Sequence, residues 1–447
     1  MIGTIPKRFN YYSKLESQPH SLEAMYANGE VVTEDIRLLN SFMTSFSVMI
    51  HLCNCEFKGD LRFNHIHFEE KVLFNACVFE EKVIFQNCIF KQDVSYEKYY
   101  DDDGVNSKKT IFKKQVCFIG CTFGVEKTSE DFTPTSVHFK DVEFQGDVCF
   151  KETTFHSKVR FHNSIFTQSV DFENTVFNDL ADFYYTIFES AQQFHLTDFM
   201  GITIFSNATF EKEVQFLHNK VSSTSSISFQ EVEFQQALDI SRANFGCTLS
   251  FFGAEINENP TELGLYESNE GKTTAYQKIR ESFRIVKQTY TAEGNKIEAG
   301  KQNRNEMRIY WRELKASKGS PTTQLKWYER PISPRRQNLA ILWFNGLSNR
   351  HGTSWLRGFV FTIIVAIPFF GLMSLFLRNQ WVWDCSLDGA GYVIKSFLQF
   401  LNVTLWKYQP YGKEINGWAY FILFIGRLFV GYGIYQTVQA FRKFSKK

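Results

Sequence analysis

The chain has 447 residues, 48 of them Phe, and a formal net charge of +1 from 49 basic and 48 acidic residues. A hydrophobic fraction of 44% excludes a disordered chain, and nine Pro with 26 Gly exclude collagen-like and proline-rich classes. The neutral total conceals a division: residues 41–255 sum to −12, whereas residues 256–447 sum to +14 (27 basic minus 13 acidic). We therefore expect an acidic front part joined to a basic rear part.

Residues 1–45 precede the regular pattern of the front part and are expected to form an N-terminal cap. They lack the apolar core of a signal peptide, which favours a cytoplasmic location for this end of the chain. The nine Cys are odd in number and scattered, so we expect reduced thiols rather than disulfides.

The Phe residues recur at steps that alternate between five and six, so the repeating unit has eleven residues. The longest series runs from Phe139 to Phe216, and the same rhythm covers 57–90, 112–123 and 229–251. An α-helix cannot keep this period on one face, and a fixed long period predicts stacked coils. Two residues before most of these Phe stands Val or another small or aliphatic residue, such as Val159 or Thr153, which would fill a narrow interior beside the ring.

This ladder resembles the pentapeptide-repeat family, in the variant whose Phe alternate five and six apart, and the resemblance covers residues 46–256. It implies a β-solenoid, namely a right-handed quadrilateral β-helix with four rungs per coil. One coil would then take about 22 residues, which predicts eight to nine coils and a rod of about 40 Å.

Two polar insertions, residues 97–111 and 124–138, interrupt the ladder. With four rungs per coil, both leave corners that border the same face, so they are candidate partner-binding loops. Surface insertions without a function are the alternative. The candidate residues in the insertions are Asp101, Asp102, Asp103, Glu126 and Glu130.

Behind the ladder, residues 270–318 predict a helical hairpin. The spacing of apolar residues predicts one helix over Thr274–Ala292 and a second, basic helix over Lys296–Ser317. Residues 319–350 read as a linker and juxtamembrane segment, because Pro and Arg are frequent there.

Residues 351–447 predict a membrane domain with two spans, Gly358–Leu377 and Asn416–Phe441, each long enough to cross the hydrocarbon core of a bilayer. Arg and Lys flank the start of the first span and the end of the second, which favours the inner (cytoplasmic) membrane with both termini cytoplasmic. Between the spans, Tyr392–Trp406 is too short to cross and predicts an interfacial or re-entrant helix.

Three rear segments, GNKIEA, NRHGTSWLRG and YQTVQAFRKF, also resemble bacterial pentapeptide-repeat proteins with a C-terminal membrane domain, some of which look like two-helix ion channels. This resemblance implies a homo-oligomeric pore. Arg427 in the second span would line that pore or pair across subunits with Glu414 or a carbonyl; snorkelling or a structural hydrogen bond is the alternative. The candidate pore or assembly residues are Arg427, Asn402, Thr404, Trp406, Lys407 and Glu414.

Several other patterns are rejected. Val430–Gly433 reads VGYG, as in a potassium filter, but it does not lie between a pore helix and a following span, so close helix packing is the better interpretation. Inward thiols such as Cys55 and Cys121 would not converge on a metal. No nucleotide loop or catalytic arrangement stands out, so we expect no cofactor, no metal and no enzyme activity.

Two functions remain open. The first is a membrane protein whose cytoplasmic β-helix docks or senses an unknown protein, and whose spans contact the lipid bilayer as an anchor or a pore, ion-conducting or defence-effector-like. The alternative is a DNA mimic or interaction module that acts on a nucleic-acid enzyme, with the membrane part only an anchor; the acidic front part suggests it. Direct binding of nucleic acid is not expected.

Overall fold

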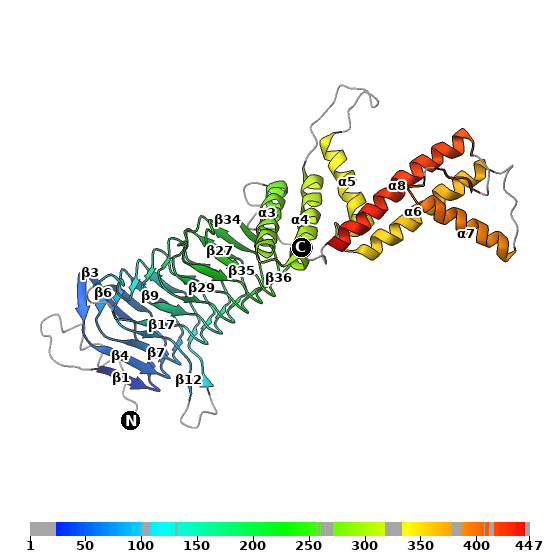
Figure 1. The fold of residues 1–447 in the computed structure, drawn as a ribbon. Coiled ribbons are helices and arrows are strands. Elements are labelled where there is room, and N and C mark those ends of the chain that lie inside the picture. Colours follow the sequence, from blue (N-terminus) through cyan, green and yellow to red (C-terminus); the bar gives the residue numbers. More distant parts are fainter. Residues whose placement is uncertain are drawn as a thin grey trace, which may run out of the picture. The chain divides into compact units, whose positions relative to one another are not determined.

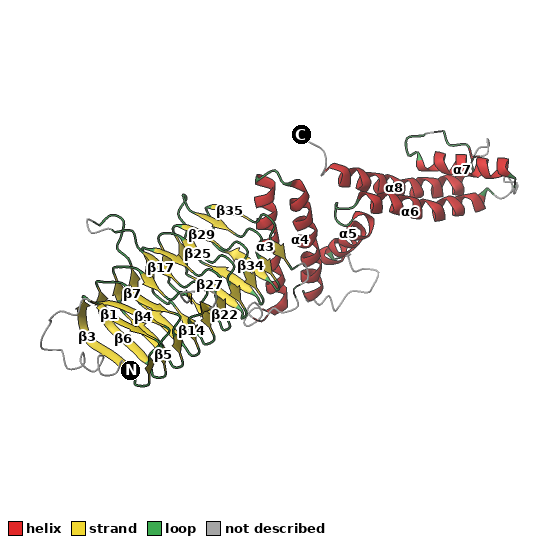
Figure 2. Ribbon diagram, turned by 90° about the horizontal axis from the view of Figure 1, so that it is seen from below, coloured by secondary structure: helices red, strands yellow, loops and turns green. Residues whose placement is uncertain are grey.

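The computed structural model describes residues 24–100, 107–129, 133–257, 260, 264, 271–317, 333–377, 386–405, 407–410 and 415–442. The chain divides into two compact units, Met1–Ile285 and Val286–Lys447. The first contains a parallel β-solenoid of about ten turns, and the second is helical (Figures 1 and 2).

The solenoid has four faces, each made of short parallel strands that stack along its length. Face A contains β1 (Ala24–Asn28), β4 (Met49–Cys53), β7 (Val72–Asn75), β11 (Val94–Ser95), β17 (Ser136–His138), β21 (Lys158–Arg160), β25 (Ala181–Asp182), β29 (Ile202–Ile204), β32 (Ser226–Ser228) and β35 (Thr248–Ser250). Face B contains β2 (Val31–Val32), β5 (Glu56–Phe57), β8 (Val78–Phe79), β14 (Ile111–Phe112), β18 (Glu143–Phe144), β22 (Ile165–Phe166), β26 (Ile187–Phe188), β30 (Thr209–Phe210), β33 (Glu233–Phe234) and β36 (Glu255–Ile256).

Faces C and D are joined by long strands that turn a corner. Face C contains β3 (Ile36–Phe46), β6 (Leu61–Phe68), β9 (Val83–Gln86), β15 (Val116–Ile119), β19 (Val148–Cys149), β23 (Val170–Asp171), β27 (Gln192–His195), β31 (Val214–Leu217) and β34 (Leu238–Arg242). Face D contains the ends of β3 and β6, then β10 (Ile89–Phe90), β16 (Thr122–Phe123), β20 (Thr154–Phe155), β24 (Val176–Phe177) and β28 (Asp198–Phe199). The β-solenoid expected from the ladder is therefore confirmed.

The aromatic rings form columns along the axis of the solenoid. In the column that begins at Phe57, neighbouring rings stack with centroids 4.7–5.4 Å apart, close to the spacing of stacked strands. Rings of different columns meet edge to face, as Phe150 and Phe161 do at 5.7 Å. Because consecutive coils are in register, each ring lies directly on its equivalent in the next coil, and the core is continuous.

The small inward residues that precede the Phe rings form hydrogen bonds between coils. The Oγ1 atoms of Thr175 and Thr186 donate to the carbonyl oxygens of Phe150 and Phe161, both at 2.7 Å. A short hydroxyl can reach the carbonyl of the preceding coil and still leave room for the rings. Each of these two carbonyl oxygens also accepts a hydrogen bond from a backbone N–H, that of Thr153 or of Ser164, so the hydroxyl is a second donor that ties neighbouring coils together.

Two opposite corners of each coil require a left-handed backbone. Asn54, Asn87, Asn163, Asn174 and Asn207 occupy these corners with φ between 51° and 59°. Asn tolerates this conformation better than most residues, which explains why it recurs at these corners. The Phe periodicity alone did not reveal this requirement.

The solenoid begins earlier than residue 46, the boundary expected from the ladder. Strands β1, β2 and β3 pair in parallel with β4, β5 and β6, so they form a coil of their own. The inward positions of this coil are aliphatic, as at Val32 and Ile36, and therefore do not continue the Phe pattern. This extra coil also explains why about ten turns replace the expected eight to nine.

Helix α3 (Gly271–Ala292) follows the last strand. The backbone N–H of Ile240 in β34 donates to Ser282 Oγ at 2.9 Å, and Ile279 and Phe283 are buried on the same side of the helix. The N-terminal half of α3 therefore packs on the solenoid. Burying the last coils in this way protects strand edges that would otherwise pair with other chains.

The second unit consists of helices. They are α4 (Lys296–Ala316), α5 (Pro334–Asn349), α6 (Trp355–Phe376), α7 (Leu387–Leu401) and α8 (Gly417–Phe441). Side chains of Asn295, Ser333, Ser354, Ser386 and Asn416 cap their N-termini. Helices α6 and α8 are long and apolar enough to cross a membrane, and they match the two expected spans within a few residues.

Helix α5 was not expected, because residues 319–350 were assigned to a linker and juxtamembrane segment. Residues 318–332 lie outside the described part of the chain. Helix α7 lies close to the expected interfacial or re-entrant segment Tyr392–Trp406, but it begins and ends earlier.

Candidate functional site

The centre of face A carries a row of polar side chains. Along a strand, alternate residues point inward and outward, so while Val94, Val137 and Val159 fill the core, their neighbours face outward. The register places these outward residues side by side across four coils: Ser95, His138, Arg160 and Asp182.

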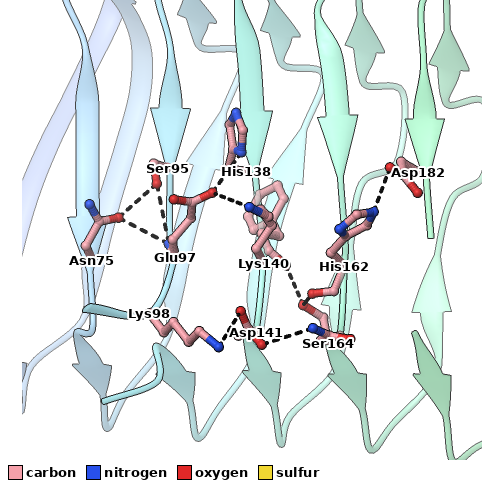
Figure 3. A network of polar contacts seen from close by, with 12 residues as sticks. Asn75, Ser95, Glu97, Lys98, His138, Lys140, Asp141, His162, Ser164 and Asp182 are labelled. Atoms are coloured by element: carbon pink, nitrogen blue, oxygen red, sulfur yellow. Dashed lines mark hydrogen bonds and ion pairs between the residues drawn. The ribbon is translucent and has the colours of Figure 1, made fainter. Parts of the chain in front are cut away.

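Ser95, His138 and Asp182 of this row take part in polar contacts with residues of neighbouring rows (Figure 3). Glu97 Oε1 lies 2.8 Å from His138 Nδ1 and 3.6 Å from Lys140 Nζ. On the neighbouring coils, His162 Nε2 lies 2.8 Å from Asp182 Oδ2. The hydrogen bond from His138, with the positive charge of Lys140, holds the pKa of Glu97 below its ordinary value.

An aromatic patch adjoins this network. The rings of Tyr184 and Tyr185 meet edge to face with centroids 4.5 Å apart, and His162 lies 5.2 Å from Tyr184. The side chain of Tyr185 is 50% exposed. Its backbone is left-handed, with φ 54°, because the residue lies at a corner of the coil. An aromatic pair of one exposed and one half-buried ring beside charged groups has the composition of a protein-binding surface.

The two insertions border face A from opposite corners. The first leaves at the end of β11 and contains the antiparallel strands β12 (Tyr99–Tyr100) and β13 (Ser107–Lys108), while the second enters at the start of β17. Since β11 and β17 are adjacent parallel strands, the insertions lie at opposite edges of one face. Both border the same face, as expected, but they do not share a corner.

Each insertion is tied to the solenoid. Lys98 Nζ, at the root of the first, lies 3.2 Å from Asp141 Oδ2. In the second, Lys127 Nζ lies 3.0 Å from Asp179 Oδ2, and Glu126 is exposed. Of the other candidate loop residues, Asp101, Asp102, Asp103 and Glu130 lie outside the described residues.

In the helical unit, α6 and α8 pack closely through small residues. A Cβ atom placed on Gly433 would lie 3.1 Å from Thr362 Cα, and one placed on Gly358 would lie 3.0 Å from Thr437 Cα. The VGYG segment is thus part of helix α8, and Gly433 allows the two helices to approach. This agrees with close packing and not with a selectivity filter.

Arg427 of α8 holds the end of α7 and the segment after it. Its Nη1 donates to the carbonyl oxygen of Leu405 at 2.6 Å, and its Nη2 donates to that of Gln399 at 3.1 Å. Its guanidinium also lies 5.3 Å from the centre of the Tyr408 ring. Within one chain, Arg427 thus forms structural hydrogen bonds, which was the alternative considered for it, whereas its role in a pore and its pairing across subunits stay predictions.

Among the other candidate pore residues, the described ones are Asn402, Thr404 and Lys407. Asn402 Oδ1 accepts hydrogen bonds from the backbone N and the Oγ1 of Thr404, at 3.1 and 2.7 Å, so these two residues form a local turn after α7. Lys407 is exposed. Trp406 and Glu414 lie outside the described residues.

The described cysteines are free. Cys121 Sγ, for example, donates to the carbonyl oxygen of Phe85 at 3.4 Å, as the inward Thr residues do in other coils. Burial raises the pKa of Cys77 and of Cys121 well above its ordinary value, so these thiols stay protonated. Within the described residues, no three His, Cys, Asp or Glu side chains gather as metal ligands would.

These features define a parallel β-solenoid with an outward polar face, followed by a helical unit that contains two membrane-length helices. Residues 54–95 and 139–187, both within the solenoid, match the family described as pentapeptide repeats (nine copies), so such repeats are present in this chain. No curated protein and no solved structure shows significant similarity to it. Solenoids of this kind present extended surfaces to protein partners.

Proposed function

We propose that this chain is a non-enzymatic membrane protein whose solenoid docks a protein partner on face A. The observation that carries the proposal is the union, in one chain, of a rigid solenoid with two apolar helices of membrane length. The outer surfaces of α6 and α8 are rich in exposed apolar side chains, including Ile364, Leu375, Phe424 and Leu428, which suits contact with lipid. The expected location is the inner membrane, with both termini in the cytoplasm.

Face A is the best docking surface for three reasons. Its central outward side chains are fixed by a network of ion pairs, so binding would cost little side-chain ordering. The Tyr184–Tyr185 pair supplies aromatic contact area. The two insertions stand at its opposite edges and would flank a bound partner.

DNA mimicry is less well supported than protein docking. A mimic needs carboxylates that remain uncompensated, as the phosphates of DNA are. On this solenoid many carboxylates lie 2.5–3.0 Å from lysine ammonium groups. Such pairs are Lys71–Asp93, Lys91–Glu69, Lys113–Glu80 and Lys151–Glu173.

The membrane helices would assemble as a homo-oligomer if they form a pore. Helices α6 and α8 of one chain pack directly against each other, so a channel would have to lie between chains. The mass of the detergent-solubilised full chain tests this point. Several copies per particle support assembly, whereas a single copy removes the pore and leaves an anchor.

Site-specific photo-crosslinking in cells tests the docking face. A photoreactive phenylalanine analogue replaces Tyr185 at a corner of face A or, as the control, Asn174 at the opposite corner. Both positions are exposed and have nearly the same φ, 54° and 56°. We expect one discrete crosslinked product from position 185 and none from position 174. Equal crosslinking, or none at either position, would contradict docking on face A, and inhibition of topoisomerase supercoiling by the full chain would favour DNA mimicry.

A further inference from the structure

Helix α5 presents an apolar face that no described residue covers. Ile341 is 57% exposed, Trp343 55% and Leu347 49%, and Phe344 lies beside Trp343 with ring centroids 5.0 Å apart. These residues follow the helical period and form one stripe along α5. Exposure of such an apolar stripe to water is unfavourable, and a stripe of this kind marks a site of contact with a membrane or another protein.

The opposite side of α5 is polar and fixed to α8. Asn345 Oδ1 accepts hydrogen bonds from Tyr432 Oη at 2.8 Å and from Gln436 Nε2 at 3.1 Å. Asn349 is fully buried and donates to the carbonyl oxygen of Gln436 at 3.2 Å. The helix therefore buries Asn349 and Leu342 and turns its larger apolar side chains outward, whereas a helix on a water-soluble protein would bury those large side chains.

Exposed arginines surround this end of the helical unit. Arg336 stands one turn before the apolar stripe, Arg350 ends α5, and Arg357 lies in the first turn of α6. Within the described part of the chain, the guanidinium groups of these three residues form no ion pair. The ring of Trp355 stacks on that of Phe441 at 5.2 Å, so the start of α6 and the end of α8 meet at this level.

We propose that α5 is an interfacial helix that inserts its apolar stripe among lipid acyl chains while Arg336, Arg350 and Arg357 bind anionic phospholipid headgroups. This inference rests on the proposed function, because it requires α6 and α8 to lie in a bilayer. The exposed apolar surface of α5 then continues that of the two membrane helices. The arginines lie where the lipid phosphate groups would be, so their positive charges are complementary to an anionic membrane surface. Trp343 and Trp355 have the position that Trp prefers, between headgroups and hydrocarbon.

The headgroup preference is testable with the full chain in detergent micelles that contain equal amounts of phosphatidylglycerol and phosphatidylcholine. Native mass spectrometry then counts the lipids of each kind that remain bound. We expect the natural chain to retain phosphatidylglycerol preferentially and the variant R336Q/R350Q/R357Q to lose that preference by about tenfold or more. The control variant K109Q/K114Q/K158Q removes three exposed charges from the solenoid and should behave as the natural chain does.

A second variant separates lipid from protein as the occupant of the stripe. Trp343→Ala should leave the mass of the solubilised particle unchanged and reduce the quenching of the protein's Trp fluorescence by brominated lipids. A smaller particle would mean that the stripe binds a second copy of the chain, and this would overturn the proposal. Equal retention of phosphatidylglycerol by the natural chain and the arginine variant would overturn it as well.

The two proposals can fail separately. If the chain does not sediment with membranes at all, the proposed function fails, and the α5 proposal fails with it. If the chain stays in membranes but shows no preference for anionic lipid, only the α5 proposal is overturned.

Discussion

Phe161 illustrates how single residues stabilise the solenoid. It is fully buried and stacks between Phe139 and Phe183, with ring centroids 5.1 and 4.9 Å away. The coils above and below fix the neighbouring rings, so they cannot fill a cavity at this position. We expect Phe161→Ala to lower the free energy of unfolding by about 3–5 kcal/mol.

Urea unfolding of the full chain, followed by far-ultraviolet circular dichroism, measures this loss. Phe252→Ala is the control, because Phe252 belongs to the same solenoid but is 63% exposed. The control should change stability by less than about 1 kcal/mol. Similar losses in the two variants would contradict the aromatic core.

Glu97 predicts an acid dependence of solenoid stability. Its pKa is lowered in the folded chain, chiefly by the hydrogen bond from His138. A lowered carboxyl pKa contributes stability that is present above the unfolded value, about 4.3, and is lost as the pH falls through the folded value. We therefore expect Glu97→Gln to unfold at a lower temperature than the natural chain at pH 7, and the difference to vanish well below pH 4.

Thermal unfolding over a series of pH values checks this dependence. Glu81→Gln serves as the control, since Glu81 is exposed and forms no ion pair within the described residues. Its melting temperature should follow that of the natural chain at every pH. A difference for Glu97→Gln that persists undiminished in acid would contradict the role of the ionised carboxylate.

At the scale of residues, the inward positions were predictable and the outward contacts were not. The step of five or six in the Phe series follows directly from the geometry of a coil, so the sequence alone was sufficient. Glu97 pairs with His138 because the coil that contains the two insertions brings β11 beside β17. No local sequence pattern predicts this pairing of strands. The Asn residues at the corners could have predicted the left-handed backbone there, but the Phe periodicity alone does not take them into account.

At the scale of elements, the contact between α6 and α8 depends on glycine. Gly433→Ala would place a methyl group against the backbone of Thr362, so the helices would have to separate. We expect a loss of about 1–3 kcal/mol in the stability of the helical unit. Gly371→Ala in α6 is the matched control, because no atom outside its own helix lies within 4 Å of the added Cβ.

Protease resistance of the detergent-solubilised full chain during heating measures this effect. Residues 286–442 of the Gly433→Ala variant should be cut at a lower temperature, while the solenoid stays resistant in both variants. Equal resistance of Gly433→Ala and Gly371→Ala would contradict the packing of α6 on α8.

The helices differ in how well their sequences predicted them. The spans were found because each is an apolar run long enough to cross a bilayer, broken in the second span only by Arg427. Helix α5 was missed because Pro334, two arginines and several polar residues give it the composition of a linker. The partners of Arg427 are two carbonyls on the chain between the spans, and their positions depend on how that segment folds back.

At the scale of the whole molecule, the two compact units correspond to the division of charge and composition along the chain. The acidic part forms the solenoid, with several of its carboxylates paired with lysines on the surface. The basic part forms the helical unit, where exposed arginines adjoin apolar helices. This division is the physical basis for assigning docking to the first unit and membrane contact to the second.

Extraction of membranes from cells that express the full chain tests the central claim most directly. Peripheral proteins leave membranes in alkaline carbonate, whereas chains that span the bilayer remain in the pellet. The account predicts that the chain stays in the pellet and that replacing lipid-facing Ile364 and Phe424 by Arg releases it, because each buried charge opposes insertion. Release of the natural chain into the supernatant would contradict the account.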